Sequence, residues 1–176
     1  MELRTERLIL RPQRGDDVAA IIAGLNNYEV TRYLTVVPFP YTEADAEAWV
    51  SQQRPAVPGA AHFAIELPGE GMIGGVGLAA ELGYWLNRRY HGRGYMTEAS
   101  TAVLDWHFAA LPDDLVHSGA HVGNTASLNV QKKLGFVDTG VPSMRFVRSQ
   151  GREIEHVETT LVRADYEAAR RRLRTS

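Results

Sequence analysis

The sequence predicts a mixed α/β fold of the α+β type, in which helices flank a mostly antiparallel sheet. Three strand patterns follow one another within residues 62–86, a strongly periodic helix follows at residues 95–110, and a hairpin pattern lies at residues 144–148 and 153–162. Strands joined by short turns pair antiparallel, whereas a helical crossover joins parallel neighbours. The predicted order β-α-α-β-β-β-α-β-α-β-β therefore excludes the regular alternation of a doubly wound parallel sheet.

The N-terminal third is expected to hold one short strand and two helices. Residues 8–10 are apolar and form the strand. Residues 28–41, which contain two prolines, are expected to be irregular. Thr42 is expected to cap a second helix that runs to about Gln53, with Asp45 at its third position. The first helix is marked by four apolar residues at helical spacing, which are Val18, Ile21, Ile22 and Leu25.

The middle of the chain is expected to form an antiparallel meander and then the longest helix. The segments HFAIEL, MIGGVGL and ELGYWL have strand character, and a turn at residues 68–71 separates the first two. The helix is expected from about Tyr95 to Ala110, and Pro112 closes it. Its buried stripe is predicted to be Met96, Ala99, Val103, Trp106 and Ala110.

The last third is expected to add a strand, a short helix and a hairpin. The strand is expected at residues 114–122 and the hairpin turn at residues 149–151. Between them a helix is predicted at residues 125–134, with Asn124 as its N-cap and Gly135 as its C-terminal stop. Both caps are local signals, so these helix ends are sharply predicted.

Length and composition set the limits of function. The 176 residues are expected to form one domain, with a core at about residues 3–162 and a C-terminal helix or tail at residues 163–176. The formal net charge of -2 excludes a polybasic nucleic-acid or membrane surface. The absence of cysteine excludes disulfides, thiolate metal sites and a cysteine nucleophile. Neither a signal peptide nor a membrane span is indicated, so a cytoplasmic location is expected by default.

The junction NRRYHGRGYM, between the meander and the long helix, predicts a site for a diphosphate. A helix N-terminus presents unpaired N–H groups and a partial positive charge, which attract phosphate. Gly92 and Gly94 let an anion approach the backbone, and Arg89 and Arg93 can add charge-assisted hydrogen bonds. The lysine-containing P-loop and the dinucleotide fingerprint are both absent from the sequence. The alternative is a solvated arginine loop before an ordinary helix.

Four segments together carry a resemblance to a known family. Arg89-x-x-Gly92-x-Gly94 resembles the acetyl-CoA signature [RQ]-x-x-G-x-[GA] of GNAT N-acetyltransferases. TERLILRP, ELGYWLNRRYHGRGYMTEA and NTASLNVQKKLGF resemble segments of the RimJ/RimL-like branch, and the similarity in order and spacing covers about residues 3–162. The resemblance implies the GNAT acyl-CoA N-acyltransferase fold, acetyl-CoA as cosubstrate and no metal.

The resemblance also implies where the cofactor lies. It would enter between two neighbouring parallel strands, residues 81–87 and 115–122, that splay apart. Its pantetheine would pair with free backbone groups on the first strand, and its pyrophosphate would lie on the amides of residues 92–97. The implied cofactor-binding residues are Trp85, Leu86, Arg89, Gly92, Arg93, Gly94, Tyr95, Met96, Thr97 and Asn124.

Two residues are candidates for the chemistry that the resemblance implies. Glu81 would be the base that deprotonates the amine; its alternative is a glutamate at the solvated end of a strand. Ser127 would stabilise the leaving thiolate by donating a hydrogen bond; its alternative is to support the cap made by Asn124. Many family members place a tyrosine where this chain has Gln131, so the tyrosine mechanism does not carry over.

The acceptor site is implied to lie between residues 27–41 and the C-terminal hairpin. Its predicted lining includes Tyr33, Tyr41 and Arg145, with Phe39, Arg148 and His156 nearby. Glu153, Glu155 and Glu158 cluster near the last predicted strand, where they form either half of a cation site or a solvated edge, and the edge is favoured.

The expected function is transfer of an acetyl group from acetyl-CoA to a primary amine of a protein N-terminus or small molecule, by direct attack in a ternary complex. The alternatives are an acyl-CoA sensor of the same fold without turnover, and a nucleotide-binding regulatory domain that uses the same loop. The expected partner is the amine acceptor, with neither nucleic acid nor membrane, and the chain is expected to be a monomer or a homodimer.

Overall fold

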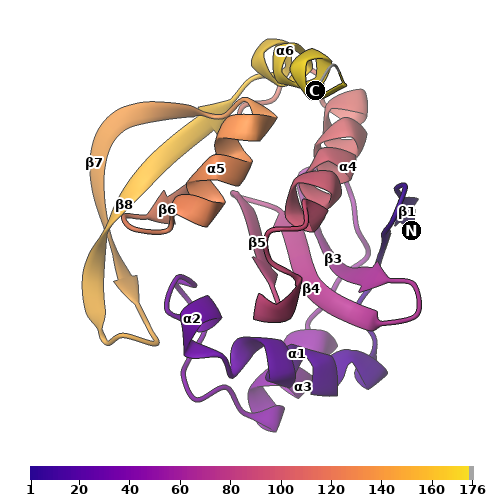
Figure 1. Cartoon of the computed structure of the whole chain (residues 1–176), viewed down its shortest axis with the longest axis vertical. Coiled ribbons are helices and arrows are strands. Elements are labelled where there is room, and N and C mark those ends of the chain that lie inside the picture. The colour runs from indigo at the N-terminus through magenta and orange to yellow at the C-terminus, as the bar shows by residue number, and fades with distance from the viewer. Residues whose placement is uncertain (175–176) are drawn as a thin grey trace.

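A computed structural model describes residues 1–174, and it places two antiparallel sheets side by side (Figure 1). Residues of both sheets line a cavity, which we call the central opening. The first sheet has the order β1-β2-β3-β4-β5 and the second the order β6-β8-β7. Their strands are β1 (Leu3–Arg4), β2 (Ile9–Arg11), β3 (Ala61–Leu67), β4 (Gly71–Leu78), β5 (Leu82–Leu86), β6 (Val116–His121), β7 (Val137–Val147) and β8 (Arg152–Leu161). The mixed, mostly antiparallel fold predicted from the sequence is confirmed.

The helices divide between two groups in space. Figure 1 shows α1, α2 and α3 together at one end of the molecule, and α4, α5 and α6 at the other. They are α1 (Val18–Leu25), α2 (Tyr28–Thr31), α3 (Glu43–Ser51), α4 (Tyr95–Ala110), α5 (Thr125–Leu134) and α6 (Arg163–Arg174), with short 3-10 turns η1 (Gly15–Asp17) and η2 (Arg88–Tyr90). Helices α1 and α4 contact the first sheet, whereas α5 contacts β6 of the second sheet and α6 packs on α5.

Two hydrophobic clusters lie on the opposite faces of this sheet. One packs Phe63 and Ile73 against Val103 of α4, and the other packs Ile21 of α1 against Met72. Consequently β4 is buried along residues 72–78 and carries an almost uninterrupted apolar and glycine sequence, as a strand covered on both faces requires.

Glycines in and near this sheet make room for one large ring. A side chain at Gly24 of α1 would overlap the ring of Trp85, and a Cβ at Gly75 would lie 2.9 Å from the Trp85 indole nitrogen. The ring of Trp85 thus fills space that only glycine leaves open. This packing fixes β5 against β4 and α1.

Local capping signals explain why several element ends match the sequence predictions. The Thr42 hydroxyl accepts the Asp45 N–H at 3.2 Å, while the Asp45 carboxylate accepts the Thr42 N–H at 2.9 Å, which closes a capping box. Both predicted ends of α4 and of α5 are confirmed, with Asn124 and Gly135 as the caps of α5.

Other boundaries depart from the predictions. Residues 28–31, expected to be irregular, form α2, because the Asn27 side chain accepts the Glu29 N–H and caps a short turn. Ala110, expected in the buried stripe, is exposed at the end of α4. Strand β7 begins at Val137, well before residue 144, because it follows β8 beyond a register shift. Residues 175–176 of the predicted C-terminal helix lie outside the described residues.

Candidate active site

The central opening is a cavity of about 750 Å³. No strand pairs with the outer edge of β5 in residues 1–174, and β5 and β6 belong to separate sheets. A hydrogen bond of 2.8 Å from the Ser118 hydroxyl to the Leu82 carbonyl links the two strands at one point. Residues from β5, the start of α4, α5, β6 and the segment after α2 line the cavity. This geometry leaves an unpaired strand edge facing a space of ligand size.

The register of β5 decides which backbone groups face the opening. Asn87 donates its N–H to Ile73 of β4 at 2.9 Å, and the pairing from there back to Leu82 is regular. Alternation therefore turns the backbone groups of Trp85 toward β4 and those of Tyr84 toward the opening. The expectation that the Trp85 backbone pairs with a ligand is thus wrong, although Trp85 does line the cavity.

Leu86, the second backbone predicted to pair with the cofactor, does face the opening. Its carbonyl accepts a hydrogen bond from His91 Nε2 at 2.8 Å. Because a carbonyl can only accept, this contact places the ring proton of His91 on Nε2. The Leu86 N–H is the group at this residue that a ligand can still use.

The turn into α4 presents a row of free amides. Gly92 has φ +74° and Gly94 has φ +81°, both in the left-handed region that favours glycine. The first helical hydrogen bond runs from the Glu98 N–H to the Gly94 carbonyl at 3.0 Å. The backbone N–H groups of residues 92–97 donate to no other described residue, and most of these residues line the cavity. Such a row suits an anion with several oxygens.

An N-terminal segment braces this turn. The Glu98 carboxylate accepts hydrogen bonds from the Thr5 hydroxyl at 2.5 Å and from the Arg7 N–H at 2.9 Å. The Arg7 guanidinium also donates to the Arg93 carbonyl at 3.0 Å. Burial raises the pKa of Glu98, but these hydrogen bonds outweigh it and hold the pKa below its ordinary value. Thr5 and Arg7 lie within the TERLILRP segment, and their part in holding this turn was not predicted from the sequence.

The side chains of Arg89 and Arg93 lie elsewhere. Both residues are exposed, and neither lines the cavity. The Arg89 guanidinium lies 3.6 Å from a carboxylate oxygen of Glu70 and stacks near the Tyr90 ring. Direct contacts of these two arginines with phosphate therefore remain a prediction.

Ser127 lies at the first turn of α5, where both of its predicted roles meet. The Asn124 side chain accepts the Ser127 N–H at 3.3 Å, so the cap exists. The Ser127 hydroxyl lies 3.0 Å from the Tyr84 hydroxyl and 3.2 Å from the Gln131 amide nitrogen. Asn124, Ser127 and Tyr84 all line the cavity.

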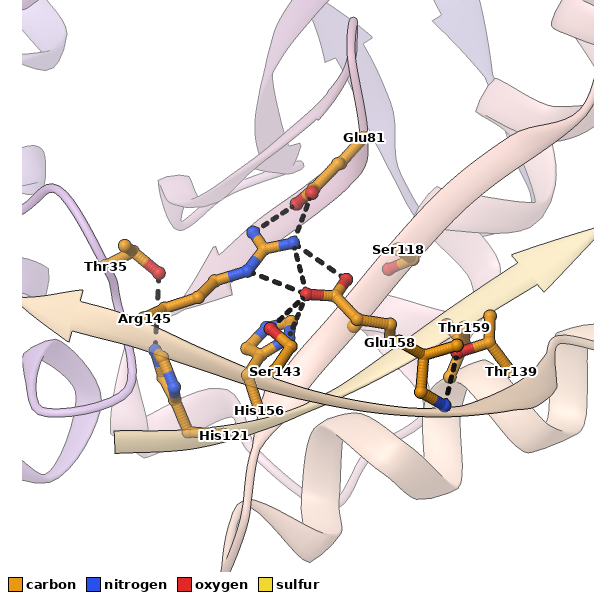
Figure 2. Close-up of polar contacts among 12 residues, drawn as sticks. Thr35, Glu81, Ser118, His121, Thr139, Ser143, Arg145, His156, Glu158 and Thr159 are labelled. Atoms are coloured by element: carbon orange, nitrogen blue, oxygen red, sulfur yellow. Dashed lines mark hydrogen bonds and ion pairs between the residues drawn. The ribbon is translucent and has the colours of Figure 1, made fainter. Parts of the chain in front are cut away.

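Glu81 is paired with an arginine that the sequence analysis placed in the acceptor site. Arg145 donates to both carboxylate oxygens of Glu81, at 2.9 and 2.5 Å, and also to both oxygens of Glu158 (Figure 2). Hydrogen bonds from Arg145 to Glu81 and Glu158 outweigh burial and raise the pKa of Arg145. Glu81 is therefore neither a free base nor a glutamate solvated on all sides.

Only one of the three clustered glutamates of β8 faces this cavity wall. The Glu158 carboxylate accepts hydrogen bonds from Ser143 at 2.6 Å and from Arg145, while Glu153 and Glu155 are exposed. Burial raises the pKa of Glu158, but the hydrogen bonds outweigh it and lower the pKa overall. The solvated-edge interpretation thus holds for Glu153 and Glu155 and is wrong for Glu158.

Two buried histidines lie beside this charge cluster. The rings of His121 and His156 are 4.9 Å apart, and His121 Nε2 lies 3.3 Å from the Thr35 hydroxyl. Burial, His156 and Arg145 lower the pKa of His121 to about 4. Burial and Arg145 also lower the pKa of His156. Both rings are therefore neutral near pH 7 and add no charge to the cavity.

The predicted acceptor tyrosines reach the same cavity. Tyr33 and Tyr41 both line it, together with Arg145 and Arg148. The Tyr33 hydroxyl accepts a hydrogen bond from Arg32 at 2.6 Å, whereas Tyr41 is buried, and burial raises its pKa. The cavity thus joins the predicted cofactor and acceptor regions. No group of three or more potential metal ligands occurs among residues 1–174.

Comparisons with known proteins agree with this geometry. Residues 7–137 match the acetyltransferase (GNAT) domain family. The chain is 26% identical over 174 residues to a Bacillus licheniformis protein described as "uncharacterized N-acetyltransferase p20", covering 93% of this chain and 97% of that protein. Within the described residues, no helix has the length and apolar character needed to cross a membrane.

Two solved structures share the fold at low sequence identity. Spermidine N-acetyltransferase from Vibrio cholerae, in complex with CoA and spermine, superposes with a TM-score of 0.75 at 18% identity, covering 92% of this chain and 99% of that one. Ribosomal-protein-S5-alanine acetyltransferase from Vibrio fischeri gives a TM-score of 0.71 at 21% identity, covering 94% and 98%. At these identities the likeness establishes the fold alone.

Proposed function

Because the chain belongs to the acetyltransferase (GNAT) family, we propose that it transfers an acetyl group from acetyl-CoA to a primary amine. The amine belongs to a protein N-terminus or a small molecule, and it attacks directly in a ternary complex. The observation that carries this proposal is the row of unengaged amides at residues 92–97, which opens into the cavity beside the free edge of β5.

The residues present fit the cofactor. Free amides at the N-terminus of α4 supply donors and a partial positive charge for the pyrophosphate. Gly92 has no atom within 4 Å of where a Cβ would lie, so phosphate oxygens can approach its backbone. The Tyr84 backbone and the Leu86 N–H supply strand-like partners for the pantetheine amides.

Acyl transfer requires a neutral amine, a polarised carbonyl and a stabilised leaving group. The amine nitrogen forms a bond to the acetyl carbon, the carbon–sulfur bond breaks, and the bonding pair leaves on sulfur. The Ser127 hydroxyl donates a hydrogen bond to that sulfur. The proton lost by the amine passes to Glu81, directly or through a water.

The ion pair with Arg145 constrains how Glu81 takes the proton. Each carboxylate oxygen carries two lone pairs, so Glu81 can accept from Arg145 and still accept from a water or an amine. The free energy needed to deprotonate the acceptor amine depends on the pKa of that amine. An α-amine is about 2.5 pKa units less basic than a lysine side chain, which lowers the cost of deprotonation by about 3.4 kcal/mol.

The charged residues that line the cavity as a whole balance, with Glu29, Asp45 and Glu81 against Lys133, Arg145 and Arg148, and it is the local cluster at Glu81 that favours a cationic acceptor. Glu81 and Glu158 carry two negative charges against the single positive charge of Arg145, and the adjacent histidines are neutral. The remaining negative charge attracts an ammonium group on its way to deprotonation. The two structural neighbours named above are a spermidine enzyme and a ribosomal-protein enzyme, and both kinds of acceptor present amines. Membership of the RimJ/RimL-like branch and a cytoplasmic location are part of this proposal.

The alternative is a sensor that binds acyl-CoA without turnover. The observation in its favour is that Arg145 already donates hydrogen bonds to both carboxylate oxygens of Glu81, the predicted base. An assay of free-thiol release from acetyl-CoA with a panel of N-terminal peptides, polyamines, amino acids and aminated antibiotics separates the two. Turnover with any amine supports the enzyme. Tight CoA binding without release across the panel, including larger acyl groups, supports the sensor. Stabilisation by ATP or NAD but not by CoA would overturn both.

A further inference from the structure

The Ser127 hydroxyl contacts two side chains, one from its own helix and one from β5. Gln131 lies one helical turn further along α5, and Tyr84 reaches from β5 across the opening. Tyr84 and Ser127 line the cavity, whereas Gln131 is only 1% exposed and lies behind them. Gln131 is the residue that stands where many family members have tyrosine.

The amide orientation of Gln131 is fixed by its neighbours. Its nitrogen donates to the Gly119 carbonyl at 2.8 Å, and its oxygen accepts from the Thr159 hydroxyl at 2.8 Å. A flipped amide would place two oxygens against each other at Gly119, because a carbonyl can only accept. The nitrogen therefore also points its second N–H at the Ser127 hydroxyl oxygen, 3.2 Å away.

The Tyr84 hydroxyl has both of its contacts on Ser127. It lies 3.0 Å from the Ser127 hydroxyl and 3.2 Å from the Ser127 carbonyl. The Tyr84 phenol has one proton, so it donates either to this carbonyl or to the Ser127 hydroxyl; the hydroxyl is the nearer acceptor and is taken as the partner of that proton. A serine hydroxyl has two lone pairs and one proton, so donors at both lone pairs leave its proton for a third partner.

We propose that Tyr84 and Gln131 are positioning residues that occupy the lone pairs of the Ser127 hydroxyl and thereby turn its proton toward the sulfur of the cofactor. The inference rests on the proposed function. Under this inference Gln131, which stands at the position of the missing tyrosine, does not donate to the thiolate. Gln131 instead orients the Ser127 hydroxyl, which is the donor. Tyr84 completes the arrangement only because β5 and α5 meet across the opening.

Tyr84 acts without losing its proton. Burial raises the pKa of Tyr84, and this outweighs the lowering by its polar neighbours Ser127 and Gln131. The phenol therefore stays protonated while the thiolate leaves, and it strengthens the Ser127 donor by polarising it. No proton is transferred along the chain of hydroxyls in this arrangement, so the bond changes remain those of the acyl transfer.

The first experiment measures the thiol of bound CoA directly, without an acceptor amine. Ultraviolet absorbance of the thiolate, followed against pH, gives the thiol pKa in the complex. A donor aimed at sulfur stabilises the thiolate and lowers this value. We expect Tyr84→Phe, Gln131→Met and Ser127→Ala each to raise it, by about one pH unit for loss of one hydrogen bond.

The second experiment tests whether both residues act through Ser127. We expect Tyr84→Phe to lower kcat about tenfold, with the KM for acetyl-CoA changed less than about twofold. In the Ser127→Ala background, the same substitution should have no further effect on kcat, since its target is gone. Tyr166→Phe is the matched control: it removes a buried phenol hydroxyl that bonds Asp105 outside the cavity, and it should leave both kcat and the thiol pKa unchanged.

Each outcome decides a different point. Absence of CoA binding by the unmodified protein would overturn the proposed function itself. Binding with the same thiol pKa in the unmodified protein and in folded Tyr84→Phe and Gln131→Met variants would overturn only the positioning role. Equal effects of Tyr84→Phe in the presence and absence of Ser127 would do the same, because they would show that Tyr84 acts elsewhere. Circular dichroism and thermal unfolding identify any variant that fails to fold.

Discussion

The two walls of the cavity differ in how much of their hydrogen-bonding capacity is already used. The amide wall, residues 92–97, presents N–H groups that donate to no described residue. In the charge cluster, Glu81, Arg145 and Glu158, the hydrogen-bonding groups are already paired with one another. Arg145 donates to both carboxylates, with nitrogen–oxygen distances of at most 3.0 Å (Figure 2). One wall comes from a single segment, and the other from three elements distant in sequence.

This difference indicates how each wall meets its ligand. Unpaired donors held in place by a braced turn bind an anion without breaking any internal bond. In the charge cluster, a ligand must replace one of the existing hydrogen bonds or bind through a water molecule. The cluster is therefore expected to contribute less to ligand binding and more to the stability of the fold than the amide wall does. Substitutions in the amide wall should therefore affect binding most, and substitutions in the charge cluster should affect folding and pH dependence.

The largest effect is expected from Gly94→Trp in the amide wall. A large side chain at this left-handed residue blocks the approach to the amides, so CoA affinity should fall more than about a thousandfold, or about 4 kcal/mol. Isothermal titration calorimetry with CoA measures this loss. Gly140→Trp is the matched control, since Gly140 also has positive φ, with no atom near its Cβ position and no place in the cavity lining. Unchanged CoA affinity in Gly94→Trp would contradict the assignment of the amide wall.

The next effect concerns the pH dependence of folding beside the charge cluster. The pKa of His121 is about 4 in the folded protein, below the ordinary 6.5, so the unfolded chain binds this proton first. The free energy of unfolding should therefore fall as the pH drops from about 6.5 to about 4, by about 2–3 kcal/mol for this group. Urea unfolding at several pH values measures the slope.

The same experiment has an internal control. His121→Gln should remove about one proton from the slope between these pH values. His117→Gln, at an exposed residue of the same strand, is the matched control for the loss of an imidazole. An equal slope in the unmodified protein and His121→Gln would contradict the buried neutral state of His121.

A smaller loss of stability is expected when the cluster loses its cation. Arg145→Met leaves Glu81 and Glu158 close together without the cation between them, and it should lower the free energy of unfolding by about 1–2 kcal/mol, a modest loss because the cluster is partly exposed to solvent and Ser143 still donates to Glu158. The control is Arg163→Met, which breaks an exposed pair with Glu167 and should cost less than about 0.5 kcal/mol. Equal losses in the two variants would show that the cluster is no more than a surface ion pair.

The smallest effect is expected from Glu81→Gln on turnover. If Glu81 takes the amine proton, kcat should fall about tenfold near pH 7 and recover at higher pH, where the amine loses its proton unaided. The matched variant Glu158→Gln also weakens the hold on Arg145, but it should leave the shape of the pH–rate profile unchanged. A parallel drop at every pH in Glu81→Gln would remove its role as base and leave that role to water.

Local chemistry explains which features were predictable. The ends of α4 and α5 and the capping box at Thr42 depend on residues within one helical turn, so a single segment contains the whole signal. The amide wall is of the same kind, since glycine spacing and a helix N-terminus lie side by side in the chain. Only the alternation of β5, which depends on its pairing with β4, showed that Trp85 turns its backbone away from the opening.

The partners of the catalytic candidates were not predictable in this way. Arg145 and Glu81 are 64 residues apart, Tyr84 and Ser127 are 43 apart, and Thr5 and Glu98 are 93 apart. Charge or hydroxyl character at these positions gave no sign of which residues would meet. Arg145 was therefore predicted in the acceptor site and Glu81 as the base, although the fold joins them in one ion pair.

The sequence by itself determined the order of the longer elements, though not β1 or α2, the caps of the main helices and the glycine-spaced turn that offers amides to an anion. The tertiary structure alone decided that Glu81 is bound by Arg145, that Glu158 turns inward, and that Tyr84 and Gln131 lie within hydrogen-bond distance of the Ser127 hydroxyl. The physical reason is range: helix caps and turns are set by contacts a few residues apart, whereas the state of a buried charge or hydroxyl is set by groups that only the packed sheets and helices bring together.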